Sequence, residues 1–378
     1  MALVYTEEQE MVRDSAKGFL AEKASVSVFR KMRDAADSLG WSRALWVEMA
    51  EMGWAGILVE EQYGGLDFGM TGAALILEEM GKNLTASPFL SSAVMASQVL
   101  RGASEAQKQA WLPKMVSGEA IIALALDEGI KHDPAGSQLQ AEKLGNGYRL
   151  KGSKTYIIDG FEADGYLVLA RTDGEAGDKE GLSLFLVDAR AKGISTSSTK
   201  LLDSRNYAGA KFDNVEVSGG DLIGEAGKGL DALEPALNAG RIGLAAEMLG
   251  ASAQCFESSM EYLKDRSQFG QKIGSFQGLQ HRSAHLYCEL ELVRSAVIKA
   301  GQDFEASAEH SGMIASLAKA KSGEVAILAA NEGVQMLGGI GMTDEHDMGL
   351  YMKRIRAAQE LLGDYAFHAN RFAKWRGF

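Results

Sequence analysis

Cysteine and proline are both scarce in this chain of 378 residues. The two cysteines, Cys255 and Cys288, are too few for a disulfide framework or a four-cysteine zinc site. They favour a protein whose thiols stay reduced. Only four prolines are present, so long helices are permitted over most of the sequence.

Long hydrophobic runs and a signal peptide are also missing. We find no apolar run of the length that a bilayer-spanning helix requires. The first residues, Met1 to Glu8, turn acidic at once and lack the basic and then apolar pattern of a secretory signal. The sequence therefore predicts a cytoplasmic protein without a membrane span.

Basic residues are fewer than acidic ones, and the formal net charge is −12. Nucleic-acid binding needs clustered Lys and Arg that neutralise phosphates, so a main role of that kind is excluded. One local basic site for a phosphorylated ligand remains compatible with this charge. The length is too great for one simple core and predicts two or three packed lobes.

The apolar pattern predicts three successive regions. Helical periodicity runs through residues 1–118, beginning with a capping box at Thr6 and Gln9. Short strand-like runs with little between them fill residues 119–225, including a hairpin around Gly145 to Gly147. Helical periodicity then returns over residues 226–378, in segments at about 230–265, 276–304, 312–337 and 346–373.

This order predicts an α+β fold with three domains. We expect an N-terminal α-helical domain at 1–118 and a middle β domain at 119–225. The middle domain is expected to be an antiparallel barrel or sandwich, since no helix-length insert separates its strands. A C-terminal four-helix bundle is expected at 226–378.

Two glycine-containing motifs lie at the ends of predicted bundle helices. One runs from Arg266 through Phe269 to Gly270, and the other from Gln335 to Gly341. The second could be mistaken for a Rossmann fingerprint, but it follows a helix rather than a strand, so that interpretation fails. Glycine at such places permits positive φ and lets another backbone approach closely.

The sequence around these motifs resembles the acyl-CoA dehydrogenase family over nearly the whole chain. The central signature spans Tyr262 to Gln277, and Trp54 to Gly65 is similar to the family's N-terminal loop. The resemblance implies the family's three-domain fold and α,β-desaturation of an acyl-CoA thioester with FAD. It also implies a homo- or heterotetramer of homologous subunits and an electron-transferring flavoprotein as acceptor.

The resemblance implies that this chain contacts FAD held mainly by a neighbouring subunit. Arg266 would bind the pyrophosphate, because the fixed donors of a guanidinium pair with phosphate oxygens. Phe269 would pack against the nucleotide. The other expected contacts to the nucleotide are Gln277, Gln335, Gly338 and Gly339.

The catalytic base of the family is missing from both of its usual positions. One position precedes an arginine in the first bundle helix, which aligns with Arg241, and here it holds Gly240. The other precedes a glycine in the last segment and holds Leu362. Only Glu360 and Asp364 lie close by in sequence, and residues two apart on a helix face away from each other. We expect Arg241 to contact the substrate.

The segments that would face the flavin ring are altered as well. The family has a Thr or Ser before Glu-Pro, whereas this chain reads Asp127-Glu128-Gly129. The family's Trp-Ile-Thr or Trp-Ile-Ser run is replaced by Tyr156-Ile157-Ile158. The expected hydroxyl groups are therefore absent, and Asp127 is a poor neighbour for a ring that becomes anionic when reduced.

Three interpretations remain open from the sequence. In the first, this chain is one subunit of a heteromeric enzyme, of the type associated with lipid or steroid catabolism, and a partner supplies the base and ring pocket. In the second, it is a self-sufficient homo-oligomer with a relocated base. In the third, it is a non-catalytic homologue kept for assembly or ligand binding.

Overall fold

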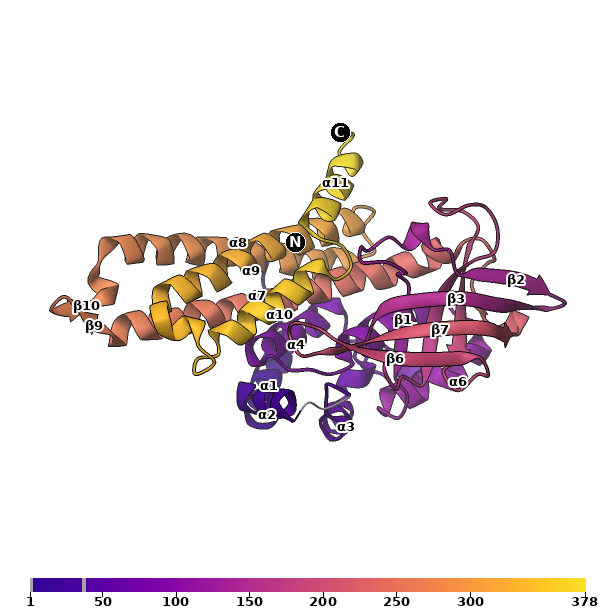
Figure 1. The fold of residues 1–378 in the computed structure, drawn as a ribbon, viewed down its shortest axis with the longest axis horizontal. Coiled ribbons are helices and arrows are strands. Elements are labelled where there is room, and N and C mark those ends of the chain that lie inside the picture. Colours follow the sequence, from indigo (N-terminus) through magenta and orange to yellow (C-terminus); the bar gives the residue numbers. More distant parts are fainter. Residues whose placement is uncertain (1–2, 36–38) are drawn as a thin grey trace. The chain divides into compact units, whose positions relative to one another are not determined.

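The first part of the chain is helical, as the sequence predicts (Figure 1). The computed structural model describes residues 3–35 and 39–378. The helices are α1 (Glu7–Lys23), α2 (Val26–Asp34), α3 (Arg43–Glu51), α4 (Met70–Asn83), the π-helix η3 (Phe89–Ala96), α5 (Ser97–Arg101) and α6 (Glu105–Val116). The predicted capping box is confirmed, because Thr6 Oγ1 accepts from Gln9 N and Gln9 Oε1 accepts from Thr6 N.

A single sheet follows, with strand order β6-β7-β3-β2-β4-β5-β8. The strands are β1 (Ile122–Ala125), β2 (Gln140–Leu144), β3 (Gly147–Ile158), β4 (Gly165–Arg171), β5 (Leu182–Asp188), β6 (Ile194–Lys200), β7 (Asn206–Val217) and β8 (Leu222–Ile223). Most neighbours are antiparallel, as predicted, and the β2–β3 hairpin is confirmed.

Two features of the sheet were not predicted from the sequence. Strand β1 joins β4 in parallel, and β2 adds one parallel bridge to β4. Strand β6 was not predicted, because its Ser- and Thr-rich sequence is almost wholly exposed and shows no apolar alternation. Pairing with β7 alone places it in the sheet.

The last part of the chain is helical again. Its elements are α7 (Gly229–Asp265), β9 (Ser267–Gln268), β10 (Gln271–Lys272), α8 (Gln277–Glu305), α9 (Ser311–Leu337), the 3-10 helix η7 (Gly338–Met342), α10 (Met348–Glu360) and α11 (Tyr365–Trp375). The predicted single segment at 346–373 is therefore wrong. It is two helices, because Leu362 and Gly363 adopt positive φ values of 56° and 105°, which no α-helix accommodates.

Packing divides the chain into two compact units. The first unit, here called the bundle unit, comprises Met1–Lys31, Met70–Thr85 and Arg241–Phe378. The second, the sheet unit, comprises Met32–Gly69 and Ala86–Gly240. Helices α1 and α4 thus pack with the C-terminal helices, whereas α3, α5 and α6 group with the sheet. The sequence boundaries near 118 and 225 stay a prediction.

One segment of the bundle unit is more apolar than the sequence analysis stated. Among the described residues, Ser311–Met342 is long and apolar enough by length and composition to cross a bilayer, with a mean hydropathy of 1.2. Of its most apolar window, 44% is buried. Most of the segment is α9, which packs against α8, α10 and α11, and this packing accounts for its apolar composition.

Helices α4 and α7 approach each other through two glycines. A Cβ on Gly81 would collide with the carbonyl oxygen of Glu247, and a Cβ on Gly250 would collide with that of Glu78. The obstacle in each case is backbone, which cannot rotate away as a side chain can. This contact therefore requires glycine on both helices and sets how closely α4 lies on α7.

We expect Gly250→Ala to lower the free energy of unfolding by about 2–3 kcal/mol, because the added methyl group must displace the backbone of α4. Gly18→Ala is the matched control: Gly18 lies in the middle of α1 with nothing within 4 Å of its missing Cβ. That variant should raise stability by up to about 1 kcal/mol. Denaturant unfolding of both variants tests this, and equal effects would contradict the close approach of α4 and α7.

Candidate cofactor and catalytic site

The predicted nucleotide contacts gather at one end of the bundle unit. Helices α8 and α9 run antiparallel, as the bidentate pair between Arg282 and Glu332 shows, with N–O distances of 2.6 and 2.9 Å. The start of α8 at Gln277 therefore lies at the same end as Gln335 and η7. The β9–β10 hairpin, which carries Phe269, lies beside this end (Figure 1).

This end of the bundle unit is accessible to a ligand. Arg266, Gln277 and Gln335 are exposed, and the Arg266 guanidinium makes no ion pair within residues 3–35 and 39–378. Nothing lies within 4 Å of the missing Cβ of Gly338 or Gly339. Free guanidinium donors beside an open glycine backbone suit a phosphate-bearing ligand, so these residues fit the nucleotide of FAD.

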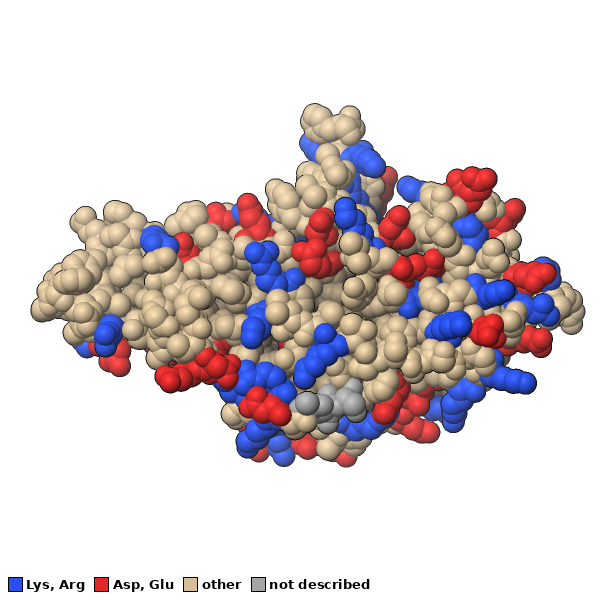
Figure 2. Space-filling model, in the orientation of Figure 1, with Lys and Arg blue, Asp and Glu red and all other residues tan. Residues whose placement is uncertain are grey.

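Phe269 occupies an unusual position for an aromatic residue. It and Gly270 form the two-residue turn between β9 and β10, with φ values of 56° and 79°. Such a turn favours Asn-Gly, and a bulky residue there is strained by about 1 kcal/mol or more. Its side chain is 90% exposed. The hairpin therefore presents an aromatic ring to solvent, and Figure 2 shows few charged atoms around this end.

The first expected base position lies inside α7. Gly240 is buried there and contributes no side chain, and Arg241 is 1% exposed. The Arg241 guanidinium lies close enough to Lys319 to lower the pKa of that lysine. A direct contact between Arg241 and substrate remains a prediction, and its burial means that access would have to come from a cleft rather than from the open surface.

The second expected base position lies in the turn between α10 and α11. Lys319 on α9 donates from Nζ to Gln359 O at 2.8 Å and to Gly363 O at 3.2 Å. His368 on α11 donates from Nε2 to Leu362 O at 3.1 Å. Carbonyl oxygens on both sides of the turn are thus held by two buried side chains, and Leu362 is 6% exposed.

The tautomer of His368 follows from its partners. A carbonyl oxygen only accepts, so Nε2 must carry the hydrogen that is shared with Leu362 O. Nδ1 is then the acceptor for the hydroxyl of Ser316, 3.2 Å away on α9. Ser316, His368 and Lys319 together fasten the turn to α9 and α11.

Neither nearby carboxylate is placed as a base. Asp364 caps α11 and accepts from Phe367 N at 2.8 Å. Glu360 is exposed at the last residue of α10. Both residues raise the pKa of Lys319 by their charge. A relocated base at either residue stays a prediction.

Burial dominates the ionisation of Lys319. Its side chain is removed from water, and this lowers its pKa to about 7, with Glu360 opposing the shift and Arg241 adding to it. A neutral amine keeps two hydrogens for Gln359 O and Gly363 O. The turn can therefore stay fastened in either protonation state.

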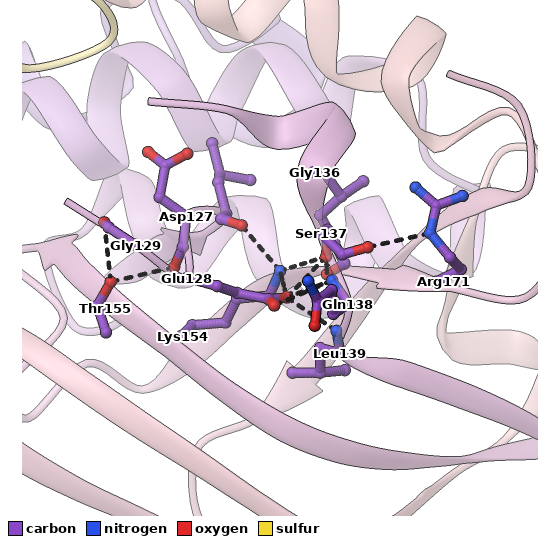
Figure 3. Close-up of polar contacts among 12 residues, drawn as sticks. Asp127, Glu128, Gly129, Gly136, Ser137, Gln138, Leu139, Lys154, Thr155 and Arg171 are labelled. Atoms are coloured by element: carbon purple, nitrogen blue, oxygen red, sulfur yellow. Dashed lines mark hydrogen bonds and ion pairs between the residues drawn. The ribbon is translucent and has the colours of Figure 1, made fainter. Parts of the chain in front are cut away.

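A second buried lysine organises the segment of the sheet unit that was expected to face the flavin ring (Figure 3). Lys154 on β3 donates from Nζ to Leu126 O at 2.8 Å, to Glu128 Oε1 at 2.8 Å and to Ser137 Oγ at 2.6 Å. Burial raises the pKa of Glu128, but the charge of Lys154 and the backbone N–H groups of Gln138 and Leu139 outweigh it, so the net shift is downward. The carboxylate thus holds the segment in place.

The side chain of Asp127 is used within its own loop. Its Oδ1 accepts from Asp133 N at 3.0 Å, and its Oδ2 lies 2.9 Å from His132 Nδ1. Its backbone oxygen accepts from Thr155 N at 2.8 Å. The carboxylate of Asp127 is therefore already paired within its loop. It does not replace the hydroxyl group that was expected near the flavin ring.

The Tyr156 segment is rebuilt as well. Tyr156 has a φ of 51° and is 41% exposed, next to an irregularity in the β3–β7 register. Ile158 and Asp159 are buried, and Ser91 Oγ donates to Asp159 Oδ2 at 2.7 Å. The residues that replace the expected hydroxyl group thus serve packing inside the sheet unit.

Sequence reasoning missed Lys319 and His368. The available signal for Lys319 was a lysine inside the apolar stretch from Leu317 to Ala320, where burial was to be expected. His368 gave no such signal. Within the described residues, no group of three His, Cys, Asp or Glu side chains could hold a metal ion.

The domain descriptions of one family match almost the whole chain. The N-terminal, middle and C-terminal domain models of acyl-CoA dehydrogenase match residues 6–119, 127–216 and 227–376. The mitochondrial short/branched chain specific acyl-CoA dehydrogenase of Bos taurus is 30% identical, over 98% of this chain and 86% of its own length. The chain belongs to the acyl-CoA dehydrogenase family.

Solved structures agree with this assignment. Butyryl-CoA dehydrogenase from Megasphaera elsdenii has a TM-score of 0.92 and 26% identity, with all of both chains covered. A steroid ACAD variant has a TM-score of 0.87 and 27% identity, with 98% of each chain covered. The family consists of FAD flavoproteins that oxidise CH–CH donors, and the predicted fold, enzyme class and cofactor are confirmed at that level.

The buried lysine makes the stability of the chain depend on pH. An unfolded lysine has a pKa near 10.4, whereas Lys319 titrates at about 7 in the folded chain. Between these values the unfolded chain binds more protons, so stability rises with pH across the window from about 7 to 10, at about 1.4 kcal/mol per pH unit. Below pH 7 this contribution is flat.

We expect Lys319→Met to remove this slope, as measured by urea unfolding at pH 6, 7, 8 and 9. Lys321→Met is the control on the same helix, since Lys321 is partly exposed and paired with Glu289 at 2.6 Å and Glu324 at 3.0 Å. It should keep the slope. A wild-type stability that stays level over this range would contradict the low pKa.

Proposed function

We propose that this chain is one subunit of an acyl-CoA dehydrogenase that carries out α,β-desaturation of an acyl-CoA thioester, and that a homologous partner supplies the base and the flavin-ring pocket. This chain would contribute Arg266, Gln335 and their neighbours to the nucleotide of an FAD seated in the partner. The observation that carries the proposal is the absence of a carboxylate at both expected base positions, Gly240 and Leu362.

The chemistry explains why that absence matters. Desaturation requires removal of the α-proton by a carboxylate, and bound FAD accepts the β-hydrogen as hydride. A positioned base typically contributes ~10²–10⁴-fold to a rate. Gly240 has no side chain, and Leu362 places an apolar group in a turn that is held by Lys319 and His368. The chain therefore offers no proton acceptor at either place.

The segments expected to face the flavin ring support the same proposal, in which the partner subunit supplies the ring pocket. Asp127 is tied to His132 and Asp133, and Ile158 and Asp159 are buried. In contrast, Arg266, Gln335, Gly338 and Gly339 are exposed at the end of the bundle unit. A chain that contributes contacts to the nucleotide of a neighbour's FAD needs these exposed residues. It does not need a flavin-ring pocket of its own.

The substrate and the acceptor follow from similarity alone. The similarity to a steroid ACAD supports a bulky acyl-CoA, such as a steroid side-chain thioester, as substrate. An electron-transferring flavoprotein is the acceptor that family membership suggests. We place the enzyme in the cytoplasm, as the sequence predicts.

Flavin reduction tests this function directly. The chain is purified alone and with a co-expressed homologue, the flavin absorbance is recorded, and acyl-CoA esters are added without oxygen. We expect bleaching only in the pair. Bleaching by the chain alone would favour the self-sufficient homo-oligomer, and no flavin in any pairing would favour the non-catalytic homologue.

We expect Arg266→Ala to weaken flavin retention in the pair by about tenfold or more, because charge-assisted contacts to phosphate contribute about 1.5–3 kcal/mol. Arg190→Ala is the control, since Arg190 is exposed in the sheet unit and pairs only locally with Asp188 at 3.1 Å. Flavin release during dilution and gel filtration gives the readout. Equal retention by the two variants would count against an interface role for Arg266.

A further inference from the structure

The short segment between η7 and α10 is acidic and reads Asp344-Glu345-His346-Asp347. Acids at the start of a helix usually offset the helix dipole. Asp347 is the N-cap residue of α10, but its side chain accepts no capping hydrogen bond from that helix. Its carboxylate instead accepts from Nε of Arg30, on α2, at 2.7 Å. Asp344 accepts from Nη1 of the same guanidinium at 3.2 Å. One arginine from the first part of the chain thus holds both ends of this acidic segment.

Arg30 is kept in place by its neighbour on α2. Phe29 is 6% exposed, and its ring centre lies 5.4 Å from the guanidinium of Arg354 on α10, a cation–π contact. Two successive residues of α2 therefore bind α10 or the residue that precedes it. Because Phe29 is buried independently of the ion pairs, we expect α2 to stay docked when the Arg30 side chain is changed.

Helix α9 does not set the direction of η7 by itself. The helix ends at Leu337, and Gly338 has a φ of 65° and a ψ of −136°, a conformation that favours glycine. Among residues 338–345, all of which the structure describes, only Gly341 is buried. Packing therefore gives this exposed segment little support, and its course depends on how its far end is held.

Two contacts of different kinds hold that far end. Met348 is fully buried, and its side chain occupies the space that a Cβ on Gly333 of α9 would need. This apolar contact fixes where α10 starts. The Arg30 ion pairs lie between that point and η7. A 3-10 helix rises about 2 Å per residue, so Gly339 lies within roughly 10 Å of Asp344 along the chain.

We propose that Arg30 is a positioning residue for flavin-nucleotide binding. By holding Asp344 and Asp347 it keeps η7 in the course that presents Gly338 and Gly339 to the nucleotide. This inference rests on the proposed function, since it concerns the same nucleotide site. It gives the first part of the bundle unit a role at that site, which no motif in the sequence indicates.

Arg30 acts through η7 and not by touching a phosphate. Its donors Nε and Nη1 are directed at the carboxylates of Asp347 and Asp344, and those carboxylates repel another anion. Arg266 differs in this respect, because its guanidinium makes no ion pair within the part of the chain that the structure describes. The two arginines therefore have separate tasks: Arg266 binds the nucleotide, and Arg30 places the backbone that receives it.

Amide hydrogen exchange of the full chain without flavin tests the role of these ion pairs. Thr343 N donates to Ile340 O at 3.1 Å at the end of η7, so its exchange reports on the order of η7. We expect Arg30→Gln to raise this exchange rate by about fivefold, the largest shift that a partly exposed charge pair usually gives. Arg30→Lys keeps the charge and one contact, so it should recover part of the protection.

Arg13→Gln is the matched control, because Arg13 lies on α1 and pairs locally with Glu10 at 3.5 Å. It should leave the exchange of Thr343 unchanged. Amides in the middle of α8 should exchange at the wild-type rate in every variant, which separates a local effect on η7 from a general loss of stability.

A double-variant cycle shows whether the effect runs through the ion pair. Asp347→Asn should raise the exchange of Thr343 as Arg30→Gln does, and the two changes together should add little to either one. Two effects that simply add would overturn the proposal. An Arg30→Lys variant that exchanges as fast as Arg30→Gln would overturn it as well.

Flavin release from the pair with the homologous partner connects η7 to the nucleotide. We expect release about threefold to fivefold faster with Arg30→Gln and unchanged with Arg13→Gln. The proposal is overturned if Arg30→Gln leaves the exchange of Thr343 unchanged, or raises it while flavin release stays at the wild-type rate. If Arg266→Ala still weakens retention in that case, the proposed function stands and only the role of Arg30 fails. Normal retention in both variants would count against the proposed function itself.

Discussion

The Nζ atom of Lys319 is the group on which the turn between α10 and α11 depends. A helix leaves its last carbonyl oxygens without partners, and a buried helix end needs donors for them. Lys319 supplies one to Gln359 O as α10 ends and another to Gly363 O before α11 begins. The chain can therefore turn sharply inside the protein. Both the place of Leu362 and the direction of α11 follow from that turn.

Lys154 has the same role in the sheet unit. It holds the Leu126 carbonyl, Glu128 and Ser137, and thereby fixes the segment that the family resemblance places near the flavin ring. In both units a buried lysine holds the backbone of a segment where the family resemblance implies catalytic or flavin-ring contacts. In both units the side chain expected to act there has been replaced, by Leu362 in one and by Asp127 in the other. The backbone of each segment is therefore held in place independently of which side chain stands at the expected functional position.

The fold was predictable because its elements carry strong local signals. The capping box at Thr6, the turn at Gly145 to Gly147 and the long helices of the bundle all follow from periodicity and turn chemistry. Strand β6 was missed because its polar side chains are exposed and only its pairing with β7 makes it a strand. The break at Leu362 was missed because the left-handed turn there is held by Lys319, which lies on another helix, and by burial of His368, which the sequence does not signal.

The location of the motif residues at helix ends was predictable for the same reason, whereas their contact with the nucleotide stays a prediction. Motif residues such as Arg266 and Gln335 could be placed, since they lie at helix ends that glycine marks. The fastening of the turn between α10 and α11 could not be predicted, because Lys319 lies 40 and 44 residues from the two carbonyl oxygens that it binds. The burial of a lysine also depends on what packs around it. Asp127 was expected to face a ligand, but its partners His132 and Asp133 depend on the local loop path.

The backbone strain at Leu362 helps to decide whether the fold itself prevents a carboxylate at position 362. A leucine at positive φ costs about 1–3 kcal/mol, and burying its side chain returns about 1.5–3 kcal/mol, so the two effects nearly cancel. The turn itself is held through backbone carbonyl oxygens, which any residue at 362 would also present. A carboxylate there would have Lys319 nearby as a cation. The fold therefore permits a base at this position, and its absence is a property of the side chain alone, consistent with a partner that supplies it.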